Sequence, residues 1–154
     1  MEDLIADLRD IDINNILDNW EWYFESPMEL VLVTALGDLF LRDEDDNILL
    51  FNPGSAEIIE IAGNHEEFKQ EFAKGNNINS WFLPALIDSL RAKLGPLQKG
   101  QCYGFIILPF LNGQYEISNF KIYPLKEYLD NLSTIYYQVK DLPEGTAIGN
   151  TNIK

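Results

Sequence analysis

The sequence predicts an α+β fold, with a mostly antiparallel sheet of about six strands packed with three to five helices. Two observations carry this prediction. Short apolar or alternating runs, typical of strands, fall in two blocks at residues 30–62 and 101–123, while stretches with apolar residues at helical spacing surround them. Strands and helices therefore come in blocks rather than in regular βαβ alternation, which favours antiparallel pairing.

The N-terminal stretch predicts two helices, over residues 3–9 and 13–24, because apolar residues recur there at intervals of three and four. Ser26 and Pro27 are expected to end the second helix. We expect these N-terminal helices, within residues 3–24, to pack against the rest of the domain.

Six strand-like runs follow. Turn-forming residues separate the first four, which predicts an antiparallel meander, and a turn around Gly113 joins the last two. The runs are residues 30–34, 39–42, 48–52, 57–62, 101–109 and 115–123.

Three further helices are predicted between and after these strands. The first covers about residues 64–73 and begins at its N-cap Asn64. The second covers about residues 80–94, with Pro84 tolerated in its first turn. The clearest apolar stripe in the chain predicts the last helix, over residues 125–140.

Length and composition indicate one domain, assigned to residues 1–148, followed by a tail at residues 149–154. The single cysteine, Cys102, argues against a disulfide framework and fits a reducing compartment. The chain opens without a basic and apolar leader, and no apolar run approaches membrane-spanning length. We therefore expect a cytoplasmic protein with no membrane partner.

Charge is unevenly distributed along the chain. The formal net charge is −14; residues 1–72 hold 19 acidic and 3 basic residues, whereas residues 73–154 hold 6 and 8. Nucleic acid is a poor partner for such a chain, because binding phosphate needs a basic footprint. A protein with a basic surface is favoured, since complementary fields speed association. Acidity that only keeps the chain soluble is the alternative.

Residues suited to catalysis or metal binding do not converge in the sequence. The lone histidine, His65, and Cys102 are too few ligands for a zinc site, and the run around Cys102 predicts a strand rather than a helix N-terminus that activates a thiol. We predict no catalytic residue, no metal and no cofactor, so the chain is not expected to be an enzyme. A catalytic Cys102–His65 pair and a metal-dependent hydrolase using acidic residues are the weaker alternatives.

The acidic run at residues 43–47 has three interpretations. Asp43, Asp45 and Asn47 match the first three ligand positions of a calcium loop. Ile48 and Gly54, however, occupy the positions where that loop needs glycine and glutamate. A solvated hairpin tip is favoured over a contact with a partner protein, and calcium comes last.

Two groups of residues are the predicted partner-binding candidates. Carboxylates suit a basic surface, and Trp and Tyr supply much of the binding energy at protein interfaces. For the aromatic group, core packing is the favoured alternative. The candidates are Asp43, Glu44, Asp45, Asp46, Glu57, Glu60, Trp20, Trp22 and Tyr23.

Several short motifs, spread in order over roughly residues 20–148, resemble one family. They are VTALGDLFLRD at residues 33–43, ILLF at 48–51, IEIA at 59–62, EEF at 66–68, GQCYGF at 100–105, LPFLNG at 108–113, SNF at 118–120 and QVKDLPEG at 138–145. Together they are similar to the C-terminal domain of type VI secretion immunity proteins that protect bacteria from their own DNase effectors. That domain often follows a GAD-like domain. The resemblance assigns no binding residues, because the matching glycines, Asp38 and Pro109 are interpreted as turn and packing positions.

Composition and resemblance lead to the same functional prediction. The chain is expected to be an immunity protein that binds and neutralises a cognate secreted antibacterial toxin, such as a type VI nuclease effector, by occlusion. The alternative is a cytosolic adaptor or a small-molecule-binding domain without a toxin partner.

Overall fold

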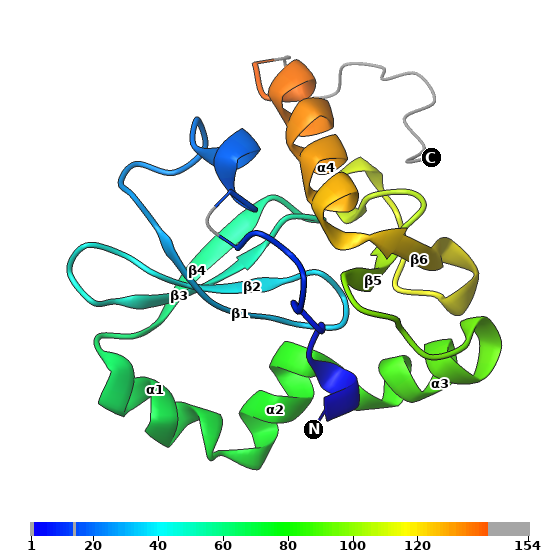
Figure 1. Cartoon of the computed structure of the whole chain (residues 1–154), viewed down its shortest axis with the longest axis horizontal. Coiled ribbons are helices and arrows are strands. Elements are labelled where there is room, and N and C mark those ends of the chain that lie inside the picture. The colour runs from blue at the N-terminus through cyan, green and yellow to red at the C-terminus, as the bar shows by residue number, and fades with distance from the viewer. Residues whose placement is uncertain (1, 14, 142–154) are drawn as a thin grey trace.

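A computed structural model describes residues 2–13 and 15–141 as two antiparallel sheets with four α-helices (Figure 1). One sheet is a four-stranded meander in the order β1-β2-β3-β4, and the other pairs β5 with β6. The strands are β1 (Glu29–Val33), β2 (Leu39–Arg42), β3 (Ile48–Asn52), β4 (Glu57–Ala62), β5 (Gln101–Phe105) and β6 (Phe120–Pro124). The helices are α1 (His65–Phe72), α2 (Gly75–Phe82), α3 (Pro84–Leu94) and α4 (Leu125–Val139). The α+β class is confirmed, with the six strands divided between two sheets.

The meander has two differently covered faces. The register pairs Phe40 with Leu50 and Leu39 with Phe51, and side chains alternate between faces along each strand. Phe40 contacts Phe68, Trp81 and Phe82 of α1 and α2, so we call its side of the sheet the helix face. Phe51 contacts three rings of the N-terminal segment, and we call its side the aromatic face. Those rings are Trp20, Tyr23 and Phe24.

Helices α1, α2 and α3 form a row along one side of the molecule, and α4 lies on the other side (Figure 1). Asn64 caps α1 as predicted, since its side chain accepts a hydrogen bond from the Glu67 N–H at 2.9 Å. The single helix predicted over residues 80–94 is wrong: α2 ends at Phe82 and α3 begins at Pro84. Proline lacks an N–H and disfavours helical backbone in the residue before it, and Leu83 accordingly adopts φ 50°.

The N-terminal helices predicted within residues 3–24 are also corrected. Among the described residues of this stretch, 2–13 and 15–24, the helical elements are the short 3₁₀ helices η1 (Glu2–Leu4) and η2 (Asp18–Trp20). Aspartate and asparagine side chains compete with helical hydrogen bonding, and the Asn15 amide indeed donates to the Asp12 carboxylate at 3.1 Å. The segment packs against the core, since Ile16 and Trp20 are fully buried.

The second sheet is shorter than predicted, and α4 follows it over nearly the predicted range. β5 ends at Phe105 and β6 starts at Phe120, with two 3₁₀ turns between them. Gly104 lets α4 approach closely, since a Cβ atom there would lie 2.4 Å from the Tyr128 ring. The Tyr128 hydroxyl accepts a hydrogen bond from the Phe105 N–H at 3.1 Å. The predicted tail at residues 149–154 lies outside the described residues.

Candidate functional site

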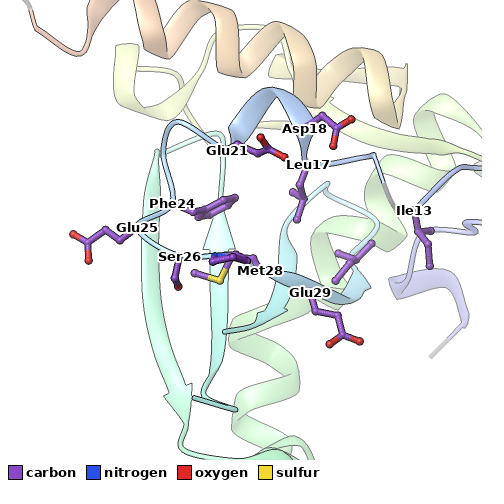
Figure 2. Close-up of a pocket in the computed structure, with 11 residues that line it drawn as sticks. Ile13, Leu17, Asp18, Glu21, Phe24, Glu25, Ser26, Met28 and Glu29 are labelled. Carbon is purple, nitrogen blue, oxygen red and sulfur yellow. The ribbon is translucent and has the colours of Figure 1, made fainter. Parts of the chain in front are cut away.

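A groove of about 630 Å³ opens beside the aromatic face of the meander (Figure 2). One of its walls, Phe24, contacts Phe51 of that face, with ring centroids 5.2 Å apart. The lining comes from the segment around η2 and from the start of β1. It consists of Ile13, Leu17, Asp18, Glu21, Phe24, Glu25, Ser26, Pro27, Met28, Glu29 and Leu30. We call this hollow the acidic groove.

Anchors on α4 hold the segment that forms the groove. The Trp20 indole N–H donates to the Leu129 carbonyl at 2.9 Å, and the Ser133 hydroxyl donates to the Asn19 carbonyl. The chain then turns at Ser26 and Pro27 to enter β1. It therefore spans from α4 to the edge of the meander and leaves a hollow beneath it.

The acidic groove combines an apolar floor with a negative rim. Leu17, Phe24 and Met28 are half-buried, and Ile13 is 50% exposed. Four exposed carboxylates surround them: Asp18, Glu21, Glu25 and Glu29. Glu29 pairs with Arg42, but within residues 2–13 and 15–141 no lysine or arginine forms an ion pair with the other three. An apolar patch with unneutralised negative charge at its edge complements a basic, partly apolar surface.

The acidic run at residues 43–46 forms the hairpin tip between β2 and β3, as predicted. Glu29 pairs with Arg42 in the sheet register, so this tip adjoins the β1 end of the acidic groove. The Asp43 carboxylate accepts hydrogen bonds from the backbone of Asp45 and Asn47, both at 2.9 Å, and from the Asn47 amide at 3.1 Å. Asp43 is thus committed to the turn.

The hydrogen bonds also act on the ionisation of Asp43. Partial burial opposes the charged form, but bonds from Asn47 and Asp45 outweigh it and hold the pKa of Asp43 below its usual value. Glu44, Asp45 and Asp46 are exposed, and they are the members of the run that project charge outward.

The three aromatic candidates differ in accessibility. Trp20 is fully buried, so the prediction that it contacts a partner is corrected; its bulk fills the core between α4 and Phe51. Trp22 is 37% exposed while its indole N–H donates to the Ser133 hydroxyl at 2.9 Å. Tyr23 is half-buried and its hydroxyl donates to the Ala56 carbonyl at 3.0 Å.

The remaining candidates, Glu57 and Glu60, lie on β4, at the opposite edge of the meander from β1. Both are exposed. Three strand spacings, about 14 Å, separate the two edges. The structure therefore does not bring these two glutamates together with the acidic groove.

The two residues considered for catalysis are also apart in the fold. Cys102 is fully buried in β5, where burial and the nearby Asp38 raise the pKa of its thiol, and His65 is exposed at the start of α1. In the described part of the chain, no three His, Cys, Asp or Glu side chains are grouped to hold a metal ion. No helix in the same residues is long and apolar enough to cross a membrane.

Sequence reasoning missed the residues that build the groove. Asp18, Glu21 and Glu25 are spaced like one face of a helix, and the first two fall within the helix predicted over residues 13–24. The pattern therefore did not single them out as a site. The available signal was the excess of acids over bases in residues 1–72. Charge alone, however, did not indicate which carboxylates gather around exposed apolar side chains.

Fold and groove together define an α+β domain with an open acidic surface. A comparison with protein families gives one match. Residues 62–135 match the model described as T6SS immunity protein Tdi1, C-terminal. This match, to a family of type VI secretion immunity-protein domains, covers 74 of the 154 residues and supports the resemblance predicted from the sequence. The match is narrower than the predicted resemblance over residues 20–148, and the acidic groove lies before its start.

Similarity to other known proteins is limited. None of the curated proteins matches the chain. A crystal structure of Atu4351 from Agrobacterium tumefaciens is similar over 82% of this chain and 62% of that chain, with 17% sequence identity and a TM-score of 0.44. The chain thus spans less than two thirds of the length of that protein.

Proposed function

We propose that the chain is an immunity protein that binds a cognate antibacterial toxin delivered by type VI secretion and neutralises it by occlusion. The observation that carries the proposal is the match of residues 62–135 to a family of immunity proteins. On this proposal the chain acts by binding, without catalysis and without a metal or cofactor. It works in the cytoplasm, where an incoming toxin must be stopped.

The acidic groove is the proposed contact surface, with the hairpin tip beside it. Its apolar floor offers area for burial, while Asp18, Glu21 and Glu25 offer charges that no cation of the described chain neutralises. A toxin that cleaves nucleic acid needs a basic groove for its substrate. An acidic surface that covers such a groove would exclude the substrate, which is why a nuclease is the proposed toxin class.

Trp22 and Tyr23 extend the proposed surface toward α4, and Glu44, Asp45 and Asp46 extend it along the hairpin. The exposed part of Trp22 can add apolar contact, since tryptophan is frequent at interface centres. Glu57 and Glu60 remain proposed only as peripheral contributors, because they lie on the far edge of the meander.

Co-expression with the product of the adjacent gene tests the proposal. The expected result is a stoichiometric complex on size-exclusion chromatography and survival of cells that die when the toxin is made alone. The toxin's DNA-cleaving activity should disappear on adding the chain. Failure to form a complex, with cells unprotected, would contradict the proposed function; a complex with a toxin of another activity would contradict only the nuclease assignment.

A further inference from the structure

A second hollow, of about 470 Å³, lies on the helix face of the meander. Leu50 comes from β3, Trp81 from α2 and Leu86 from α3. Leu83 is the residue between the two helices. The complete lining is Asp38, Leu50, Asn52, Ser80, Trp81, Leu83, Leu86 and Tyr115. We call it the Asp38 cavity.

Two hydrogen-bond acceptors of this cavity lack a well-formed hydrogen bond within residues 2–13 and 15–141. Leu39 pairs with Phe51 in the sheet register, so Asp38 and Asn52 occupy the next opposed positions, at the end of β2 and β3. The Asn52 amide oxygen is buried and accepts no well-formed hydrogen bond in the described residues, although the Asn52 and Tyr115 side chains interact. No described residue donates to the Asp38 carboxylate or pairs with it as a cation, although the Asp38 N–H is held by the Thr34 hydroxyl at 3.1 Å.

Asn52 is costly as it stands, because its amide oxygen is buried, whereas Asp38 is half-buried. A buried acceptor that has lost water without gaining a donor destabilises the fold. Burial also raises the pKa of the Asp38 carboxyl to about 8, so its charged form is disfavoured until a positive charge is brought beside it. The cavity therefore calls for a ligand that carries several N–H donors and a positive charge.

The apolar walls specify the shape of that ligand. Trp81 and Tyr115 add aromatic rings to the lining, and a planar cation stacks on such rings. Leu83, with φ 50° and ψ 60°, holds a conformation unfavourable for a branched residue, and this bend lets residues of both α2 and α3 line one cavity. A guanidinium group matches these features better than an ammonium, because it is planar, weakly hydrated and carries five donors.

We propose that the Asp38 cavity binds a guanidinium group, held by the Asp38 carboxylate and the Asn52 amide oxygen and covered by the Trp81 ring. The group can belong to an arginine side chain of a partner protein or to a free small guanidine. The first source rests on the proposed function, since the partner is then the toxin. The second source does not depend on a toxin at all.

Titration of the purified chain with agmatine, followed by the NMR signal of the Trp81 indole N–H, tests the cavity itself. A small ligand of this size is expected to saturate the signal with a dissociation constant of about 10 mM or tighter. Asp38→Asn should weaken binding by about 10-fold or more, since the charge-assisted bonds are lost. The matched control Asp88→Asn, an exposed acid of α3 outside the cavity, should bind as the wild type does.

Asn52→Leu gives a second variant, which removes the amide oxygen and should also weaken agmatine binding. Absence of a saturable Trp81 shift in the folded wild-type chain would overturn the proposal, as would equal binding by Asp38→Asn and Asp88→Asn. Repeating the titration on the complex with the toxin assigns the source. Loss of the agmatine response there indicates that a toxin arginine fills the cavity, whereas a retained response indicates a free guanidine. If no toxin binds, the titration of the purified chain still shows whether the cavity binds a guanidinium group.

Discussion

The two hollows of the molecule hold carboxylates in opposite settings. The acidic groove surrounds an apolar floor with four exposed carboxylates, whereas the Asp38 cavity has one carboxyl whose pKa is raised by burial. Exposed charges act over a Debye length and are screened by salt, so they influence how fast a partner arrives. A partly dehydrated carboxyl acts only at contact, so it influences which chemical group is retained. The number of acids in a region is therefore a poor measure of its selectivity.

The largest expected effect concerns the carboxyl of Asp38, which should change the free energy of unfolding. The folded-state pKa of Asp38 lies near 8 and its ordinary value is 3.8, so between these pH values the unfolded chain binds fewer protons than the folded one. Stability should therefore fall as pH rises from about 4 to 8. In Asp38→Asn this loss is absent, and the variant should gain on the order of 1–3 kcal/mol relative to wild type between pH 5 and pH 8. Urea denaturation at both pH values measures the gain; parallel behaviour of wild type and variant would show that Asp38 is solvated.

A smaller effect is expected from neutralising the groove. Asp18→Asn, Glu21→Gln and Glu25→Gln together should lower the association rate with the toxin by about 10-fold at low salt, with little change in dissociation. The matched control combines Asp88→Asn, Glu116→Gln and Glu127→Gln, three exposed acids outside the groove that carry the same total charge. Stopped-flow measurements at two salt concentrations compare them. Equal rates for the two triple variants would assign the effect to net charge alone.

The smallest effect separates the two roles within the hairpin tip. Asp43→Ala removes the acceptor that holds the turn and should lower the melting temperature by about 2–4 °C. Asp45 is exposed and bonds to Asp43 only through its backbone N–H, so Asp45→Asn should leave the melting temperature unchanged and reduce only the association rate. Calorimetry compares the two variants. A stable Asp43→Ala chain with slowed association would mean that Asp43, too, acts through charge.

Local patterns predicted those elements whose side chains repeat with a clear period. β2, β3 and β4 have the predicted ranges, and α4 follows its apolar stripe. The helical spacing of apolar residues in residues 3–24 gave a wrong prediction, because Ile16 and Trp20 are buried by tertiary contacts rather than along a helix face. Pro84 does lie in the first turn of a helix, as predicted, but the predicted helix over residues 80–94 joins the end of α2 to α3.

The sites were harder to predict than the fold, because they depend on which turns meet. Asp38 was interpreted only as a turn position, and its apposition to Asn52 follows from the strand register. The cavity further needs α2 and α3 to close over it, which no local pattern specifies. Among the predicted binding residues, the hairpin acids lie at the predicted turn, while Trp20 fills the core, which was the favoured alternative for the aromatic group.

The β4 strand has a consequence for self-association. Its sequence, EIIEIA, forms an outer strand of the meander, and Ile59 is 53% exposed. An isoleucine-rich strand with no outer neighbour among the described strands is a template for pairing with a second chain and for fibril growth. Glu57 and Glu60 place like charges along this edge, so two copies brought edge to edge repel each other. Beyond any contact with a partner, we therefore expect these two carboxylates to limit aggregation through the β4 edge.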